Sequence, residues 1–297
     1  MSQFATSLWR RLLHGAKRSV ARTDWETFAG AGWLDRIMHV AATDDFHEKQ
    51  GRSTGRLVLH GGGRQLAVYL KRHYRLPRWR GLFAALWPSC NWSPALQERS
   101  RLAWAQTLGI PVPAVIAAGE LLGPWGRWQS VLVVEELAGM LALHQAIPQA
   151  ARQLDPAIFR RWKSGLAAEI ARLCRLLHER CYFHKDLYLC HFFIRCEDTT
   201  HVPDWTGRVH LIDLQRLRRH RVTWPWWLVK DLAQLMYSSE VDGITGRDRL
   251  AFWRAYLGSL RHTWKGKLLC RCVLLKRRRY RDHNSKRRSR REGAAAA

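Results

Sequence analysis

The sequence predicts an α+β fold in which a small antiparallel sheet with one helix precedes a mainly helical half. Between residues 44 and 134, short apolar runs alternate with glycine clusters, which is typical of strands joined by turns. After Pro156, apolar residues recur at the spacing of one helix face: Leu166, Ile170, Leu173 and Leu177. Because strands come first and helices second, we expect two segregated lobes rather than an alternating α/β sheet.

The first half is expected to contain five strands and one helix. Asp44–Tyr74 is predicted to form a three-stranded antiparallel meander, because glycines separate its apolar runs. A helix is predicted over Pro94–Leu108, and the Gly- and Pro-containing segment 109–113 ends it. Two further strands are predicted at Val115–Ala118 and Ser130–Val134.

The second half is expected to be mainly helical. The long helix that follows Pro156 is predicted to end near His178. Short strands are predicted at Phe192–Arg195 and Arg208–Ile212, and helices over Pro225–Tyr237 and Arg247–Leu257.

Charge is the unusual property of the composition. Fifty Lys and Arg residues face 24 Asp and Glu residues, for a net charge of +26. Such an excess predicts an anionic partner, which the charge alone leaves open between nucleic acid, an anionic membrane surface and a phosphorylated substrate. Residues 1–40 are predicted to form a basic helical segment. Residues 276–297, almost pure Lys and Arg before a run of alanines, are predicted to be a disordered tail.

The remaining residues, 41–275, are expected to form the two lobes, with the boundary after residue 137. Seven cysteines occur without a CxxC pair, which favours reduced thiols in a cytoplasmic protein. No apolar run reaches the ~18 residues of a membrane span, and the N-terminus lacks the apolar core of a secretory signal.

Three charged residues are spaced as phosphoryl transfer requires. Asp186 lies in a turn between a predicted helix and strand, and Asp213 closes the next strand. Phosphoryl transfer needs one carboxylate to orient the attacking hydroxyl and a second to hold the metal that bridges the phosphates. Lys71 ends a predicted strand, where its ammonium can face phosphate oxygens, and Glu98 on the next helix is a candidate ion-pair partner.

These segments resemble kinase motifs. The run from His184 through Asp186 to His191 resembles the HRDxxxxN catalytic loop, Asp213 stands at the DFG position, and Lys71 stands at the VAIK position. More narrowly, three stretches resemble the lipopolysaccharide core heptose kinase and Kdo kinase family, over about residues 40–260: Tyr69–Arg72, His184–Phe193 and Leu211–Arg216.

The resemblance implies a two-lobed protein-kinase-like fold and a role for each motif residue in the second lobe. Asp186 and His184 would be catalytic, and Asp213 would be the principal metal ligand. Asp231 would brace the catalytic loop from a helix. His191 replaces the usual Asn; Mg²⁺ prefers oxygen ligands, whereas imidazole suits Mn²⁺ or Zn²⁺ better. His191 is therefore expected either to bind metal weakly or to contact Asp186 or substrate.

In the first lobe the resemblance implies an ATP site. Lys71 would contact the phosphates with Glu98 as its partner, Gly51 and Gly55 would belong to the loop that covers them, and Glu136 would belong to the hinge that holds adenine. The implied cofactors are ATP and Mg²⁺, with Mn²⁺ as the other candidate metal.

One spacing indicates the class of acceptor. Asp231 follows Asp213 by only eighteen positions, too few for the activation segment and peptide-docking loop of a protein kinase. The resemblance implies a kinase acting on a heptose or Kdo hydroxyl of the lipopolysaccharide core, cytoplasmic and peripheral to the inner membrane. Its partners would be the core glycolipid and the anionic membrane surface, with nucleic acid disfavoured. The alternatives are a kinase for another small-molecule or protein hydroxyl, and an inactive kinase-fold module that binds nucleic acid or membrane.

Overall fold

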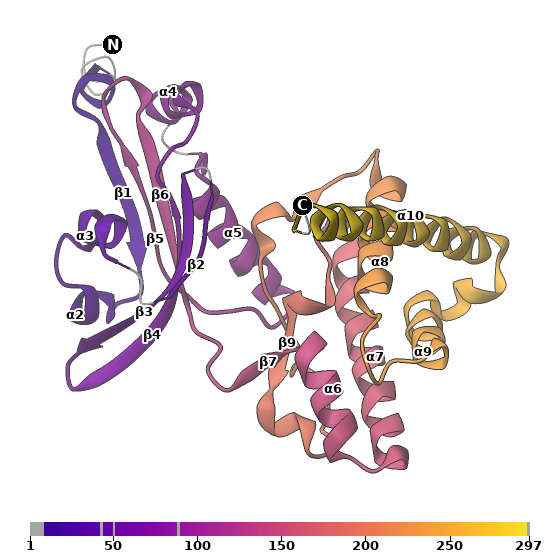
Figure 1. Ribbon diagram of the computed structural model, residues 1–297. Coiled ribbons are helices and arrows are strands. Elements are labelled where there is room, and N and C mark those ends of the chain that lie inside the picture. The colour runs from indigo at the N-terminus through magenta and orange to yellow at the C-terminus, as the bar shows by residue number, and fades with distance from the viewer. Residues whose placement is uncertain (1–8, 42–43, 50, 88–89, 296–297) are drawn as a thin grey trace. The chain divides into compact units, whose positions relative to one another are not determined.

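The computed structural model describes residues 9–41, 44–49, 51–87 and 90–295; of 44–49 and 284–295 it describes the backbone (Figure 1). The chain forms two compact units. The first, here called the sheet unit, contains the residues up to Gln106 together with Val112–Ala138. The second, the helical unit, contains Thr107–Pro111 and the chain from Gly139 onward. The units therefore divide after Ala138, next to the boundary expected after residue 137.

The sheet unit is built on one six-stranded antiparallel sheet with the order β1-β5-β6-β4-β3-β2 (Figure 1). Its strands are β1 (Ala16–Ala21), β2 (Asp44–Lys49), β3 (Arg52–Gly61), β4 (Arg64–His73), β5 (Val115–Leu122) and β6 (Trp128–Glu135). The predicted meander is β2–β4, and the two later predicted strands are β5 and β6. The prediction of five strands was one too few.

The missing strand lies in the N-terminal segment. Residues 9–14 are helical, as predicted, whereas β1 pairs with β5 from Ala16 opposite Leu122 to Ala21 opposite Ala117. Two short helices follow, α2 (Trp25–Ala29) and α3 (Trp33–His39). Trp25 and Trp33 pack edge to face at 5.7 Å between ring centroids, within the core of the sheet. Residues 1–40 are thus not a separate basic helical segment, and the first eight lie outside the described residues.

Two longer helices complete the sheet unit, α4 (Arg78–Leu86) and α5 (Pro94–Thr107). The helix predicted over Pro94–Leu108 is α5 and ends one residue earlier. Its apolar residues Leu96 and Leu102 are buried, and Glu98 is buried on the same helix. Burial of a carboxylate on this helix needs a cationic partner.

Near the end of β4, His73 predicts a pH-dependent stability. His73 is 6% exposed, and burial, with added repulsion from Arg52 and Lys71, lowers its pKa from 6.5 to about 4. The unfolded chain therefore binds a proton here more readily than the folded one. The stabilisation is complete above pH 6.5 and is lost as pH falls towards 4, by about 2–3 kcal/mol.

Urea unfolding at pH 7 and pH 4.5, compared between wild type and His73→Gln, measures this effect. The variant should lose less stability over that interval than wild type, because its glutamine does not titrate. Equal losses in the two proteins would contradict the assignment to His73.

The helical unit contains five principal helices among the described residues, with short strand pairs between them. The helices are α6 (Leu143–Gln153), α7 (Pro156–His178), α8 (Trp224–Ser238), α9 (Gly246–Leu257) and α10 (Trp264–Ala295). A three-stranded sheet has the order β10-β9-β7, with β7 (Met140–Ala142), β9 (Phe192–Arg195) and β10 (His210–Leu211), and β8 (Tyr182–Phe183) pairs with β11 (Arg218–Arg219). The end of α7 at His178 is the predicted one.

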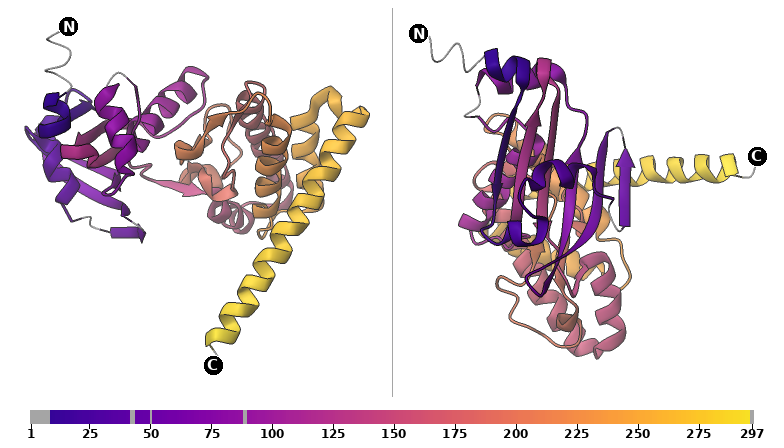
Figure 2. Two further views of the ribbon diagram at one scale, coloured as in Figure 1. Left: turned by 90° about the horizontal axis from the view of Figure 1, so that it is seen from above. Right: turned by 90° about the vertical axis from the view of Figure 1, so that its left-hand side faces the viewer.

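The predicted disordered tail is instead the second half of α10. Figure 2 shows α10 as one uninterrupted helix that extends beyond the remainder of the helical unit. Its early turns pack on α8, burying Val273. Arg277 and Arg281 then both donate to the carboxylate of Glu240, at 2.6 and 2.7 Å. The prediction was wrong because it considered charge composition and not these contacts. Among the described residues, none of the helices combines the length and the apolar character that a membrane crossing requires.

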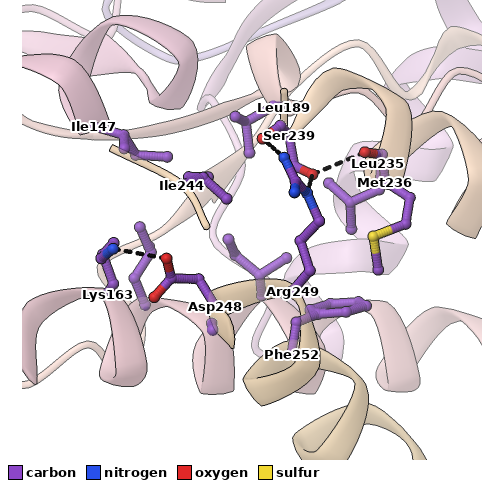
Figure 3. A pocket seen from close by; sticks show the side chains of 13 residues that line it. Ile147, Lys163, Leu189, Leu235, Met236, Ser239, Ile244, Asp248, Arg249 and Phe252 are labelled. Atoms are coloured by element: carbon purple, nitrogen blue, oxygen red, sulfur yellow. Dashed lines mark hydrogen bonds and ion pairs between the residues drawn. The ribbon is translucent and has the colours of Figure 1, made fainter. Parts of the chain in front are cut away.

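An apolar cavity of ≈ 70 Å³ lies among α6, α7, α8 and α9 (Figure 3). One ion pair and one hydrogen bond lie at its sides. Lys163 pairs with Asp248 at 2.7 Å, and Arg249 donates to the hydroxyl of Ser239 at 3.0 Å. Because these polar groups are already bonded to each other, the cavity presents mainly apolar surface.

Candidate active site

The loop that carries Asp186 is held by a buried carboxylate from α8. Asp231 has no exposed surface. Its Oδ2 accepts the backbone N–H of His184 at 2.7 Å, and its Oδ1 accepts that of Lys185 at 2.8 Å. Two charge-assisted hydrogen bonds to one buried acid fix the backbone immediately before Asp186. This is the bracing geometry expected of Asp231.

His184 links that loop to the strand before Asp213. Its Nε2 lies 3.0 Å from the carbonyl oxygen of Ile212. Burial lowers the pKa of His184, so the ring is neutral and its Nε2–H donates to that carbonyl. The side chain has no exposed surface and therefore cannot touch a substrate. We assign His184 a positioning role in place of the catalytic role predicted from the motif.

Asp186 lies where a substrate hydroxyl can reach it, because its side chain is 23% exposed. Nη1 of Arg216 donates to both of its carboxylate oxygens, at 2.9 and 2.7 Å. Arg216 comes from the short 3₁₀ turn Leu214–Arg216 that follows Asp213. The ion pair orients the carboxylate, as a positioned general base requires.

His191 supports the same loop from inside. Its Nδ1 lies 2.7 Å from the backbone carbonyl oxygen of Asp186, and its ring stacks on His184 at 5.6 Å between centroids. Burial alone would lower the pKa of His191, but the hydrogen bond with Cys190 and the Asp186 carbonyl raise it overall. The expected contact of His191 with Asp186 is therefore present, through the backbone carbonyl, and metal or substrate binding by His191 remains a prediction.

Asp213 occupies a sharp turn between β10 and the 3₁₀ turn. Its backbone is left-handed, with φ of 60°, and its Oδ2 accepts a hydrogen bond from Gln215 at 3.3 Å. Within the described residues, no group of three or more His, Cys, Asp or Glu side chains forms a metal cluster. A kinase magnesium site needs fewer protein ligands than that, since phosphates and water complete it.

The sheet unit brings Lys71 and Glu98 together. Nζ of Lys71 lies 2.6 Å from Oε1 of Glu98, whose side chain is 4% exposed. Strand β4 holds Lys71 opposite Leu132 of β6, so the ammonium comes from the middle of the sheet. The ion pair fixes a cation suited to phosphate oxygens.

Other residues predicted for the ATP site lie differently. Gly51 is in the turn between β2 and β3, with φ of 77°, whereas Gly55 is inside β3, opposite Leu70. Gly51 thus lies in the turn and Gly55 in the strand that follows it, and their contact with the phosphates remains a prediction. The Glu136 carboxylate accepts two hydrogen bonds from Arg56, at 2.8 and 2.9 Å. The side chain of Glu136 is thus committed to Arg56, and a contact with adenine remains a prediction for the backbone of this segment.

Sequence reasoning did not single out Arg216 as a partner of Asp186. The two residues are thirty positions apart, and in the sequence Arg216 is only the last residue of the family-like stretch Leu211–Arg216. With fifty Lys and Arg in the chain, nothing in the sequence distinguished this one.

Comparisons with known proteins identify relatives of this chain. The model of the lipopolysaccharide kinase (Kdo/WaaP) family matches residues 40–256. The lipopolysaccharide core heptose(I) kinase WaaP of Pseudomonas aeruginosa is 30% identical over 215 residues, which are 71% of this chain and 75% of that protein. The protein of the same name from Escherichia coli is 31% identical over 157 residues, 51% of this chain and 55% of that protein.

A solved structure described as WaaP in complex with acyl carrier protein has a TM-score of 0.64 and 24% identity, covering 88% of this chain and 98% of that one. That likeness confirms the predicted kinase-like α+β fold. The family match shows that the protein is a phosphotransferase and implies ATP as its phosphate donor. With its family match over residues 40–256, the chain belongs to the lipopolysaccharide kinase (Kdo/WaaP) family.

Proposed function

We propose that the protein transfers the γ-phosphate of ATP to a heptose hydroxyl of the lipopolysaccharide core. The observation that carries the proposal is Asp186, an accessible carboxylate on a loop whose backbone is fixed by buried Asp231. The choice of heptose rests on the relatives, which are named heptose(I) kinases. The short segment between Asp213 and Asp231 supports a sugar acceptor, because it leaves no room for a peptide-docking loop.

The residues suggest how the transfer would proceed. Asp186 orients the attacking hydroxyl and accepts its proton, while Arg216 holds the carboxylate in place. Lys71, fixed by Glu98, binds phosphate oxygens of ATP.

Magnesium is the metal that fits the donors present. Asp213 offers carboxylate oxygens, which Mg²⁺ prefers, whereas His191 offers an imidazole nitrogen, which Mg²⁺ binds less readily. We therefore assign the metal to Asp213 and not to His191. Bound there, Mg²⁺ would supply neutralisation of phosphate charge.

We further propose that the protein works at the cytoplasmic face of the inner membrane, where the basic residues of α10 would attract anionic lipid. Clusters of Lys and Arg gain about 1 kcal/mol per residue near such a surface. Arg277 and Arg281 belong to this basic stretch, although both also pair with Glu240.

Transfer of label from γ-labelled ATP to purified core glycolipid tests the function. Three acceptors are compared: core with unphosphorylated heptose, core truncated to Kdo, and heptose-containing core already phosphorylated. We expect label on the first acceptor only. Label on the Kdo-only core would identify a Kdo kinase instead, and ATP hydrolysis without labelled glycolipid would exclude the lipopolysaccharide acceptor.

A further inference from the structure

Two lysines beside Asp186 share one indole ring. Nζ of Lys185 lies 4.2 Å from the ring centroid of Trp227, and Nζ of Lys230 lies 5.2 Å from the same centroid. Nζ of Lys230 also donates to the backbone carbonyl of Lys185 at 2.6 Å. Both ammonium groups therefore contact the same indole, and one of the lysines directly precedes Asp186 in the chain.

The indole itself is held by its neighbours. His220 packs against Trp227 at 4.8 Å between centroids, and the Trp227 Nε1–H donates to the hydroxyl of Thr223 at 3.2 Å. Trp227 is half-buried. A fixed aromatic face positions a cation through its quadrupole, so the two lysines are pre-arranged rather than freely mobile in solvent.

Positive charge is concentrated around Lys230. Burial lowers the pKa of Lys230, and Arg216 and Lys276 lower it further, while Asp186 and Asp231 act in the opposite direction. Both of these carboxylates are already engaged, Asp186 by Arg216 and Asp231 by two backbone N–H groups. Half-buried like charges repel one another, and a bound anion relieves that repulsion.

The neighbouring helix extends the same arrangement. Nζ of Lys276 on α10 lies 4.7 Å from the ring of Trp226 and 5.7 Å from that of Tyr280. Trp226 is exposed. Cations held on aromatic faces therefore continue from the catalytic loop onto α10.

We propose that Lys185 and Lys230, held on Trp227, form a subsite that binds a carboxylate or phosphate of the acceptor while its hydroxyl lies at Asp186. The inference rests on the proposed function and adds a requirement: the acceptor carries an anionic group close to the accepting hydroxyl. Recognition of that anion then selects the acceptor, since a neutral sugar gains no charge-assisted contact with these two lysines.

Steady-state kinetics of Lys230→Met and Lys185→Met test the subsite. The KM for core glycolipid should rise by about tenfold to a hundredfold in each, the loss expected for one charge-assisted contact, while the KM for ATP stays unchanged. Lys185→Met keeps the bond from Lys230 to the loop, and Lys230→Arg should restore most of the affinity. Arg80→Met, which removes a similar cation–Trp contact on exposed Trp79 of α4, is the matched control and should match wild type.

Two modified acceptors distinguish the sources of the anion: core with esterified carboxylates, and core with its phosphates removed. When the modified group is the one that occupies the subsite, the wild-type KM for the modified acceptor should rise to the KM of Lys230→Met for unmodified core. The KM of Lys230→Met should not rise further on that modified acceptor. Two results would overturn the subsite. One is a KM of Lys230→Met for unmodified core within twofold of wild type. The other is a KM of Lys230→Met that rises on both modified acceptors by as much as the wild-type KM does.

Binding of the same acceptors without ATP separates this inference from the proposed function. A wild-type protein that does not label the core contradicts the proposed function. Equal affinity of wild type and Lys230→Met for the unmodified glycolipid contradicts the subsite, whether or not transfer occurs.

Discussion

Replacing Asp186 with Asn is expected to reduce the rate of phosphate transfer by about 10²- to 10⁴-fold, the usual contribution of a positioned general base. The amide has nearly the same shape as the carboxylate but cannot accept the proton of the attacking hydroxyl. It also leaves Arg216, which now donates to both carboxylate oxygens, without its ion-pair partner. The measurement is kcat for transfer of label at saturating ATP and glycolipid.

The KM for ATP should change little in Asp186→Asn, because the acid acts on the acceptor and not on the nucleotide. Asp204→Asn is the matched control, an exposed Asp of the same unit whose carboxylate bonds locally to Thr206. It should retain wild-type kcat. If Asp186→Asn keeps more than a tenth of wild-type activity with normal thermal stability, Asp186 is not the base.

The regular elements were predictable where burial imposes a period on the sequence. Helix α7 buries Leu166, Ile170 and Leu177 on one side, and its predicted end at His178 is the observed one. Strand β1 gave no such signal. Its sequence AKRSVA has a single large apolar residue, Val20, and lies at the edge of the sheet with most side chains exposed. An edge strand buries too little surface to constrain its composition.

For the C-terminal basic stretch, the composition predicted disorder, whereas the structure contains helix α10. Lys and Arg are good helix formers. Once the apolar early turns are packed on α8, burying Val273, extension of the helix requires little further stabilisation. The carboxylate of Glu240 on the adjoining segment then compensates two of the basic side chains.

Within the site, spacing and resemblance identified groups that act through local motifs. Lys71 and Glu98 were paired correctly from the strand–helix order. His184 was predicted as catalytic because it belongs to the most specific motif, but a motif does not reveal that a side chain is completely buried. Arg216 and Lys230 were missed since each reaches the loop from a distant position, and their residue types are common throughout this chain.

Replacing Asp231 with Ala is expected to destabilise the helical unit and to abolish transfer, although Asp231 touches no substrate. Removing its carboxylate leaves the backbone N–H groups of His184 and Lys185 buried without acceptors. Each such loss costs about 1–3 kcal/mol, so the free energy of unfolding should fall by about 2–6 kcal/mol. The free energy of unfolding of Asp231→Asn should lie between those of wild type and Asp231→Ala, because its one amide oxygen can accept from only one of the two donors.

Urea unfolding, together with hydrogen exchange of the His184 and Lys185 amides, measures the effect of Asp231→Ala. Exchange at these two amides should accelerate more than global unfolding explains, since the loop loses its anchor locally. Asp242→Ala, at an exposed position of the same unit, should alter neither quantity. If activity is lost while exchange at these two amides is unchanged, Asp231 takes part in the chemistry itself. If activity is lost and exchange becomes faster, catalysis by Asp186 depends on a loop that a buried charge holds rigid.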